Sequence, residues 1–172
     1  MRIIKTIPLV LFALFVLSLT KTNAQSIPKN TFKLDVGAEA LRPLSAANDF
    51  YDIGIGGTAR LNYGLTDKLA VTLTSGYYHF NYKGSGNYNL YDVNIIPIKA
   101  GLKYFLIPNV YVNGEAGVGL GRTPINYTKT IISGGFGWVY KGLDVGLKYE
   151  NNFGRYDGFK NIGLRVGYGF KL

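Results

Sequence analysis

NIGLRVGYGFKL, residues 161–172, closes the chain and decides its fold. Side chains of an extended strand alternate between two faces. One face of this stretch is bulky and apolar up to the last residue and carries Ile162, Leu164, Val166, Tyr168, Phe170 and Leu172. The other face carries Gly163, Arg165, Gly167, Gly169 and Lys171. Glycine weakens a strand and packs nothing in a water-soluble sheet, but a strand with lipid outside and a crowded lumen inside needs a narrow inner face. The stretch therefore predicts the closing strand of a transmembrane β-barrel.

The same alternation recurs along the chain. Seven further segments are predicted strands: Thr31–Leu41, Ile53–Leu65, Leu69–Tyr82, Tyr91–Phe105, Val110–Leu120, Ile131–Tyr140 and Leu143–Glu150. The connections between the eight segments alternate between long and short, as they do in transmembrane barrels with longer external loops and short periplasmic turns. The sequence predicts an all-β protein, an eight-stranded antiparallel up-and-down transmembrane β-barrel.

The fourth segment changes its phase midway. Val93 and Ile95 share one parity, whereas the apolar residues from Ile98 to Tyr104 share the other. The switch coincides with Pro97, which cannot donate a hydrogen bond to a neighbouring strand. We expect a β-bulge at Ile96–Pro97 that returns the apolar residues to the lipid side.

The bulky face could also point inward, as in a secreted soluble barrel of the lipocalin type. An eight-stranded barrel has an interior only just wide enough for side chains or one small ligand, and about five large residues per strand would overfill it. Small and charged residues fit that space. Tyrosines and Trp138 near strand ends suit the aromatic girdles of a membrane barrel. These considerations favour the transmembrane form.

Residues 1–24 have the pattern of a signal peptide. Two cations within the first five residues precede an apolar run, Ile7–Leu19, and Thr22 to Ala24 place small residues at a cleavage site. The run is shorter than the about 20 residues that cross a bilayer as a helix. We expect residues 1–24 to be cleaved off, leaving residues 25–172 as a β-barrel domain in the outer membrane of a Gram-negative cell. The chain has no cysteine, which excludes disulfides, thiolate metal sites and lipid attachment through cysteine.

The chain is basic, with a formal net charge of +9, which falls to +6 without the three cations of the signal peptide. A basic surplus can indicate a nucleic-acid partner. Here, however, the cations of the strands occur singly, as Lys33, Arg60, Lys99, Lys103, Lys148 and Arg165. A barrel lumen, or contact with the anionic phosphates of outer-membrane lipid and lipopolysaccharide, accounts for them better, and we expect no nucleic-acid partner.

Three stretches carry a family resemblance: IIPIKAGLKYFL (Ile95 to Leu106), VYVNGEAGVGLG (Val110 to Gly121) and the ending GLRVGYGFKL. With them, essentially all of the chain after residue 24 resembles the small outer-membrane β-barrel proteins of the OmpA/OmpX-like superfamily, in the form common in Bacteroidetes-type bacteria. The resemblance implies that the barrel-assembly machinery recognises the terminal strand during biogenesis, usually through an aromatic last residue. Tyr168 and Phe170 match this signal, whereas the chain ends in Leu172.

Charges inside a lumen must be paired, because an isolated buried charge is very costly. The predicted lumen network consists of Asp35, Glu39, Arg60, Lys99, Lys103, Glu115, Asp144, Lys148, Glu150 and Arg165, with Lys33 as a further cation. Two interpretations remain open: an ion-lined passage for small solutes, or the structural plug that the resemblance implies and that the narrow barrel favours. We place Glu115 at the centre of the network as a hypothesis.

Enzymatic chemistry finds little support. Small barrels similar to this one include lipid A deacylases and acyltransferases, which need a histidine with a serine or acidic partner. The only histidine, His79, is followed by Phe80 and Asn81, so the His-x-Ser arrangement is missing. The glycines at 117, 119 and 121 alternate within a strand and do not form a nucleotide-binding loop. We expect no catalytic residues, no cofactor and no metal site.

The predicted external loops are the remaining candidates for function. The second, Tyr82–Tyr91, and the fourth, Asn151–Lys160, mix aromatic, amide and glycine residues with occasional charges. Such surfaces suit contact with a surface protein or glycan. The sequence thus predicts a non-enzymatic barrel with a structural or adhesion-like role, with a small-solute pore as the alternative and a lipid-modifying enzyme third.

Overall fold

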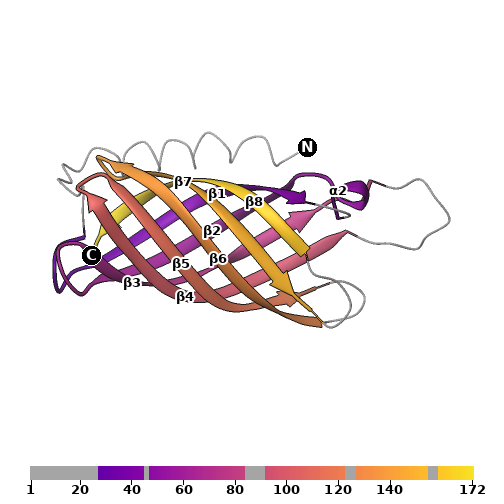
Figure 1. The fold of residues 1–172 in the computed structure, drawn as a ribbon, viewed down its shortest axis with the longest axis horizontal. Helices are drawn as coiled ribbons and strands as arrows, with labels where there is room; N and C mark the ends of the chain where they lie inside the picture. Colours follow the sequence, from indigo (N-terminus) through magenta and orange to yellow (C-terminus); the bar gives the residue numbers. More distant parts are fainter. Residues whose placement is uncertain (1–26, 45–46, 84–91, 123–126, 155–158) are drawn as a thin grey trace, which may run out of the picture.

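The computed structural model describes residues 27–44, 47–83, 92–122, 127–154 and 159–172 and forms a closed barrel (Figure 1). Its eight strands are β1 (Phe32–Leu44), β2 (Gly54–Gly64), β3 (Leu69–Phe80), β4 (Val93–Ile107), β5 (Val110–Gly121), β6 (Tyr127–Tyr140), β7 (Leu143–Phe153) and β8 (Phe159–Lys171). A short helix, α2 (Ala47–Phe50), follows β1. Within the described ranges, no helix is long and apolar enough to cross a membrane.

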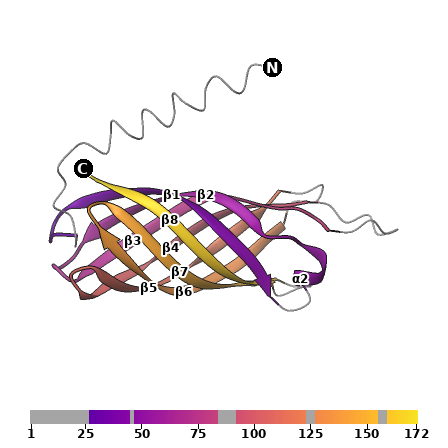
Figure 2. The same cartoon turned by 90° about the horizontal axis from the view of Figure 1, so that it is seen from above.

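Each strand pairs antiparallel with its neighbour in sequence, and β1 closes the barrel against β8. Figure 2 shows β1 between β2 and β8, with α2 at the end opposite the C-terminus. The closing register places Val36 opposite Tyr168 and Leu41 opposite Gly163. The predicted fold class is therefore confirmed, and the stretch that predicted it is the strand that closes the barrel.

Burial alternates along the strands as the predicted faces require. On β1, Lys33 and Asp35 are 4% and 0% exposed, whereas Phe32 and Val36 are 47% and 48% exposed. The small and charged face thus lines the lumen, and the bulky face forms the outer wall. This arrangement fits a lipid surround and excludes the lipocalin-type packing, in which the large side chains would fill the interior.

The prediction of a β-bulge at Ile96–Pro97 is wrong. Pro97 lies opposite Gly119 in an uninterrupted register between β4 and β5, and the register shift of this strand pair lies at its other end, between Phe105 and Ile107. Ile95 keeps its parity and faces the lumen, where it is 4% exposed. It packs there with other buried apolar side chains. The apolar residues change parity in the sequence because this part of the lumen is itself apolar.

At the end that carries α2, β2, β3 and β4 are one or two residues shorter than predicted, whereas the other strands are longer. β1 continues to Leu44, β6 begins at Tyr127, and β7 and β8 extend to Phe153 and from Phe159. The long connections between β5 and β6 and between β7 and β8 are consequently shorter than the sequence indicated. The three opposite connections are the short turns at residues 65–68, 108–109 and 141–142. Because short turns face the periplasm in such barrels, we call that end periplasmic and the end with α2 extracellular.

Aromatic side chains gather on the outer wall at the periplasmic end. This periplasmic girdle consists of Phe32, Tyr63, Tyr104, Trp138, Tyr140, Tyr168 and Phe170. Several of its rings touch: the centroids of Trp138 and Tyr140 are 5.5 Å apart, and those of Phe32 and Tyr63 are 4.7 Å apart. Amphipathic rings at one level around a barrel mark the boundary between hydrocarbon and water.

Gly117 and Gly114 lie three residues apart on β5 and test the packing of the wall. A Cβ on Gly117 would collide with the carbonyl oxygen of Ile98 and come within 2.7 Å of the Cα of Lys99, whereas a Cβ on Gly114 would meet nothing within 4 Å. We expect Gly117→Ala to lower the free energy of unfolding by about 1–3 kcal/mol because it overpacks the wall. Gly114→Ala should change it by less than about 0.5 kcal/mol.

Urea unfolding of the lipid-inserted barrel, followed by the fluorescence of the single tryptophan, Trp138, measures both values. Equal stability of the two variants would contradict the close approach of β4 and β5 at Gly117.

Candidate functional site

The described residues of the lumen form one unbranched chain of ion pairs in which cations and carboxylates alternate strictly. Its order is Arg60, Glu115, Lys99, Glu150, Lys148, Glu39, Arg165, Asp144, Lys103, Asp35 and Lys33. The separations between successive nitrogen and oxygen atoms run from 2.6 Å, for Lys148 and Glu39, to 3.9 Å, for Arg165 and Asp144. All ten residues of the predicted lumen network lie in this chain, and Lys33 forms one end of it. We call it the ion chain.

The ion chain crosses the lumen repeatedly. Lys99 and Lys103 on β4 reach Glu150 and Asp144 on β7, each at 2.8 Å. Since β4 and β7 are not neighbours in the barrel, these pairs span the interior and bind opposite walls together. The glycine-rich inner face makes this geometry feasible, because the long lysine side chains occupy the space that larger residues would otherwise fill.

Neutral hydroxyl groups add hydrogen bonds to three of the carboxylates. Thr74 donates its hydroxyl to Glu115 at 2.7 Å, and Tyr111 donates to Asp144 at 2.6 Å. Glu39 accepts from Thr58 at 2.8 Å and from Tyr78 at 3.1 Å. These partners follow from the strand registers, and nothing in the spacing of the sequence singled them out.

Glu39, and not Glu115, is the middle member of the ion chain. Glu39 is the sixth of the eleven members, counted from either end, and lies between Lys148 and Arg165. Glu115 lies next to one end and is the sole carboxylate partner of Arg60 among the described residues. The hypothesis of a central Glu115 was wrong because sequence parity places a residue inside the barrel without giving its height or its partners.

Apolar clusters cover the ion chain at both ends of the lumen. The extracellular cluster comprises Leu41, Tyr78, Phe80, Ile95 and Phe159, with Tyr51 and Val93 against it. The periplasmic cluster comprises Ile27, Ala70, Phe105, Tyr111 and Val139. Ile27 precedes the first strand and is 2% exposed, so the segment before β1 helps to fill the periplasmic mouth.

Sequence reasoning did not foresee these clusters. Their signal was present as apolar residues on the parity of the inner face, such as Leu41 on β1 and Val139 on β6.

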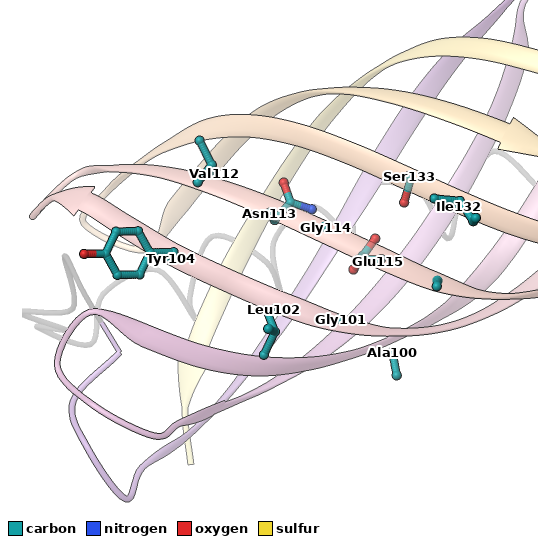
Figure 3. A pocket seen from close by; sticks show the side chains of 11 residues that line it. Ala100, Gly101, Leu102, Tyr104, Val112, Asn113, Gly114, Glu115, Ile132 and Ser133 are labelled. Carbon is teal, nitrogen blue, oxygen red and sulfur yellow. The ribbon is translucent and has the colours of Figure 1, made fainter.

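A shallow recess of about 640 Å³ lies on the outer wall across β4, β5 and β6 (Figure 3). Its apolar lining includes Leu102, Tyr104, Val112 and Ile132. Glu115 is part of the same wall but is only 3% exposed and belongs to the ion chain. The recess therefore presents apolar side chains and backbone to lipid and offers no reactive group.

His79 lies near the extracellular end of β3 and is part of a polar cluster. Its Nδ1 is 2.7 Å from Oδ1 of Asn94, and its Nε2 is 3.0 Å from Oδ1 of Asn81 and 4.0 Å from a carboxylate oxygen of Asp92. Tyr77 also donates its hydroxyl to Asn94, at 2.7 Å. Each ring nitrogen of His79 is thus within hydrogen-bond distance of a side-chain amide oxygen. In the described part of the chain, no group of three His, Cys, Asp or Glu side chains could hold a metal ion.

The first two extracellular connections are joined. Tyr51 and Tyr82 form an isolated β-bridge, and their ring centroids are 6.2 Å apart. The backbone N–H of Lys83 donates to the carbonyl of Phe50 at 2.9 Å. We call residues 47–53 together with 81–83 the loop platform. Residues 84–91 of the second predicted loop and 155–158 of the fourth lie outside the described residues.

The predicted assembly signal occupies the outer wall of β8. Tyr168 and Phe170 belong to the periplasmic girdle and have ring centroids 5.1 Å apart. Leu172 is 71% exposed, and its backbone N–H donates to the carbonyl of Phe32 at 3.0 Å. These residues are accessible from the membrane side and from the periplasm.

A closed barrel of eight strands, apolar outside and filled with paired charges, is the fold of a small outer-membrane β-barrel. Solved structures of such barrels are similar to this chain. Ail, the attachment invasion locus protein of Yersinia pestis, matches with a TM-score of 0.58 and 15% identity, over 83% of this chain and 99% of Ail.

Two proteins of Pseudomonas aeruginosa match as well. The N-terminal β-barrel domain of OprF has a TM-score of 0.56 and 18% identity over 83% of this chain and 98% of the domain. OprG has a TM-score of 0.54 and 12% identity over 87% of this chain and 99% of OprG. At these identities the similarity establishes the fold alone. Neither a protein-family model nor a curated protein sequence matches the chain.

Glu115→Gln tests whether the end of the ion chain depends on its carboxylate. The substitution leaves Arg60 buried without a carboxylate, and removing one partner of a buried pair costs about 3–5 kcal/mol. We expect the urea midpoint of the lipid-inserted barrel to fall accordingly. The double variant Arg60→Gln/Glu115→Gln should recover part of the loss, because Lys99 keeps Glu150 at 2.8 Å. Asp67→Asn in an exposed turn is the control, and a Glu115→Gln barrel as stable as this control would contradict the account.

Proposed function

We propose that this chain is a non-enzymatic integral protein of the outer membrane, with a structural or adhesion-like role at the cell surface. It is exported through a cleaved signal peptide, residues 1–24, which lie outside the described residues. The barrel-assembly machinery recognises the terminal strand through Tyr168 and Phe170. The exposed outer wall and the girdle support the membrane location, because such a belt has no favourable place in water.

The filled lumen is the single observation that carries this proposal. Lys99, Lys103 and Lys148 bind carboxylates across or along the interior at 2.6–3.1 Å, and an apolar cluster lies above and below them. A solute would have to break buried ion pairs to pass, each at a cost of several kcal/mol. This argues against the alternative of a small-solute pore and directs the search for function to the surface.

The third alternative, a lipid-modifying enzyme, is less well supported. Such chemistry needs a nucleophile, a base and an orienting group within hydrogen-bond reach. His79 has an acidic neighbour, since its Nε2 lies 4.0 Å from a carboxylate oxygen of Asp92. Its ring nitrogens, however, contact the amide oxygens of Asn94 and Asn81, and among the described residues no serine contacts the ring, so a nucleophile is missing.

The loop platform is the described surface best suited to a protein or glycan partner. Phe50 and Ile53 are 46% and 51% exposed at its edge. Backbone hydrogen bonds hold it: the N–H of Asp52 donates to the carbonyl of Asn81 at 2.9 Å, besides the bond between Lys83 and Phe50. An ordered backbone that presents exposed apolar side chains loses little conformational entropy on binding.

Phe50→Ser/Ile53→Ser removes the apolar edge of the loop platform. We expect binding of the nanodisc-embedded barrel to a panel of immobilised extracellular proteins and glycans to weaken about thirtyfold or more, as truncation of a hot-spot pair does. Leu106→Ser/Ile107→Ser is the matched control, since these apolar residues are 55% and 58% exposed at the periplasmic end. Wild-type barrel that binds no member of the panel, or equal binding by both variants, would count against the adhesion-like role.

A further inference from the structure

Two cations stand on the outer wall at the extracellular end of the seam between β1 and β8. Arg42 lies opposite Ile162, and Lys160 lies opposite Leu44, so the two cations are diagonal neighbours in the register. Both have the parity of the lipid-facing residues, and both are exposed. Diagonal positions on one face of an antiparallel pair lie within reach of long side chains. The geometry therefore brings a guanidinium and an ammonium together outside the barrel.

As far as the structure describes the chain, these two cations lack the ion-pair partners that the cations of the ion chain have. No ion pair or hydrogen bond involves the side chain of Arg42 or Lys160 within the described part of the chain. The outward residues next to them on the same strands are Leu44, Ala40 and Ile162. A pair of like charges this close is unfavourable unless an anion lies between them.

The height of the pair places it at the outer boundary of the membrane. Ten residues separate Phe32 of the periplasmic girdle from Arg42 on β1, and ten separate Phe170 from Lys160 on β8. At about 3.3 Å per residue this is about 33 Å along each strand, and a strand tilt of about 40° converts it to about 25 Å of height. The apolar band of such a barrel is also about 25 Å tall. Both cations therefore lie one membrane thickness above the girdle, at the level of the outer headgroups.

The outer wall at this level carries polar side chains among apolar and aromatic ones. Near the extracellular end the outward residues besides the two cations include Asn94 on β4, Thr128 and Thr130 on β6 and Asn151 on β7, together with Ile55 on β2, Tyr77 on β3 and Phe153 on β7. Asn151 lies directly opposite Lys160. Two cations with an amide beside them suit the phosphate and sugar headgroups of an outer leaflet.

We propose that Arg42 and Lys160 form a binding site for a phosphate group on the headgroup of an outer-leaflet lipid. This inference rests on the proposed location in the outer membrane and adds a ligand to it. A guanidinium offers two parallel N–H donors to a phosphate, and an ammonium adds a compact charge. Lipid is the occupant because the site faces sideways at headgroup level, above apolar residues that contact acyl chains. A soluble partner would have to enter the headgroup region to reach it.

The test uses the full chain, isolated folded from membranes in a zwitterionic detergent. Native mass spectrometry measures retention of diphosphoryl lipid A and of phosphate-free lipid A. We expect wild type to prefer the phosphorylated probe. Arg42→Gln/Lys160→Gln should bind that probe about thirtyfold more weakly, at about fivefold per cation, and should lose the preference. The control Lys29→Gln/Lys68→Gln removes two exposed cations at the periplasmic end and should behave as wild type.

Three results would overturn the proposal. The double variant could retain diphosphoryl lipid A at the wild-type level, or the wild type could bind both lipid A probes equally well. Inorganic phosphate could also displace lipid A completely, which would indicate a site for free anions. A heat-dependent gel shift and insertion into phosphatidylcholine vesicles are measured beforehand. Failure of wild type to insert would contradict the membrane location itself, whereas normal insertion with unchanged lipid A binding by the double variant would contradict only the phosphate site.

Discussion

The alternation of charge inside the lumen is the constraint on which the rest of the structure depends. Eleven ionised side chains in a narrow barrel are tolerable only if each carboxylate lies between two cations, as each of the five carboxylates does here. The strand registers must then be fixed, because a slip by one residue would turn the charges toward lipid. The inner face must also be narrow, and glycines opposite lysine side chains provide the room. Fold and ion chain therefore specify each other.

Because the charges must stay paired inside, the interior and the outer surface of the barrel have different roles. Apolar clusters at the two ends keep water from the ion chain and strengthen its electrostatics. With the interior committed to stability, chemistry that involves other molecules is left to the outside. The loop platform projects beyond the membrane, and the cations of the β1–β8 seam lie at its surface. Unlike the cations of the ion chain, Arg42 and Lys160 have no ion-pair partner among the described residues, and this difference separates side chains that hold the barrel together from those available to a ligand.

Much of the fold could be predicted from the sequence because a period of two and the loop lengths are local signals. The closing strand, the number of strands and the identity of the lumen residues follow from them. Partners could not be predicted, since the contact between Lys99 and Glu150 depends on how strands far apart in sequence face each other across the barrel. The apolar residues Ile95 and Leu41 were misjudged or overlooked for a related reason: parity alone does not distinguish an apolar cap inside a barrel from a return to the lipid side.

Access of water-soluble reagents to the lumen tests the central claim most directly. Ser133 lies opposite Glu115 and is 4% exposed on the inner face, and the chain has no cysteine of its own. Ser133→Cys in the lipid-inserted barrel can therefore be treated with a small cationic methanethiosulfonate, with Asp67→Cys in a periplasmic turn as the reactive reference. A sealed lumen predicts that the thiol at 133 reacts only after the barrel is unfolded in urea, while the thiol at 67 reacts at once. Labelling of both thiols in the folded barrel would contradict the closed lumen and the function built on it.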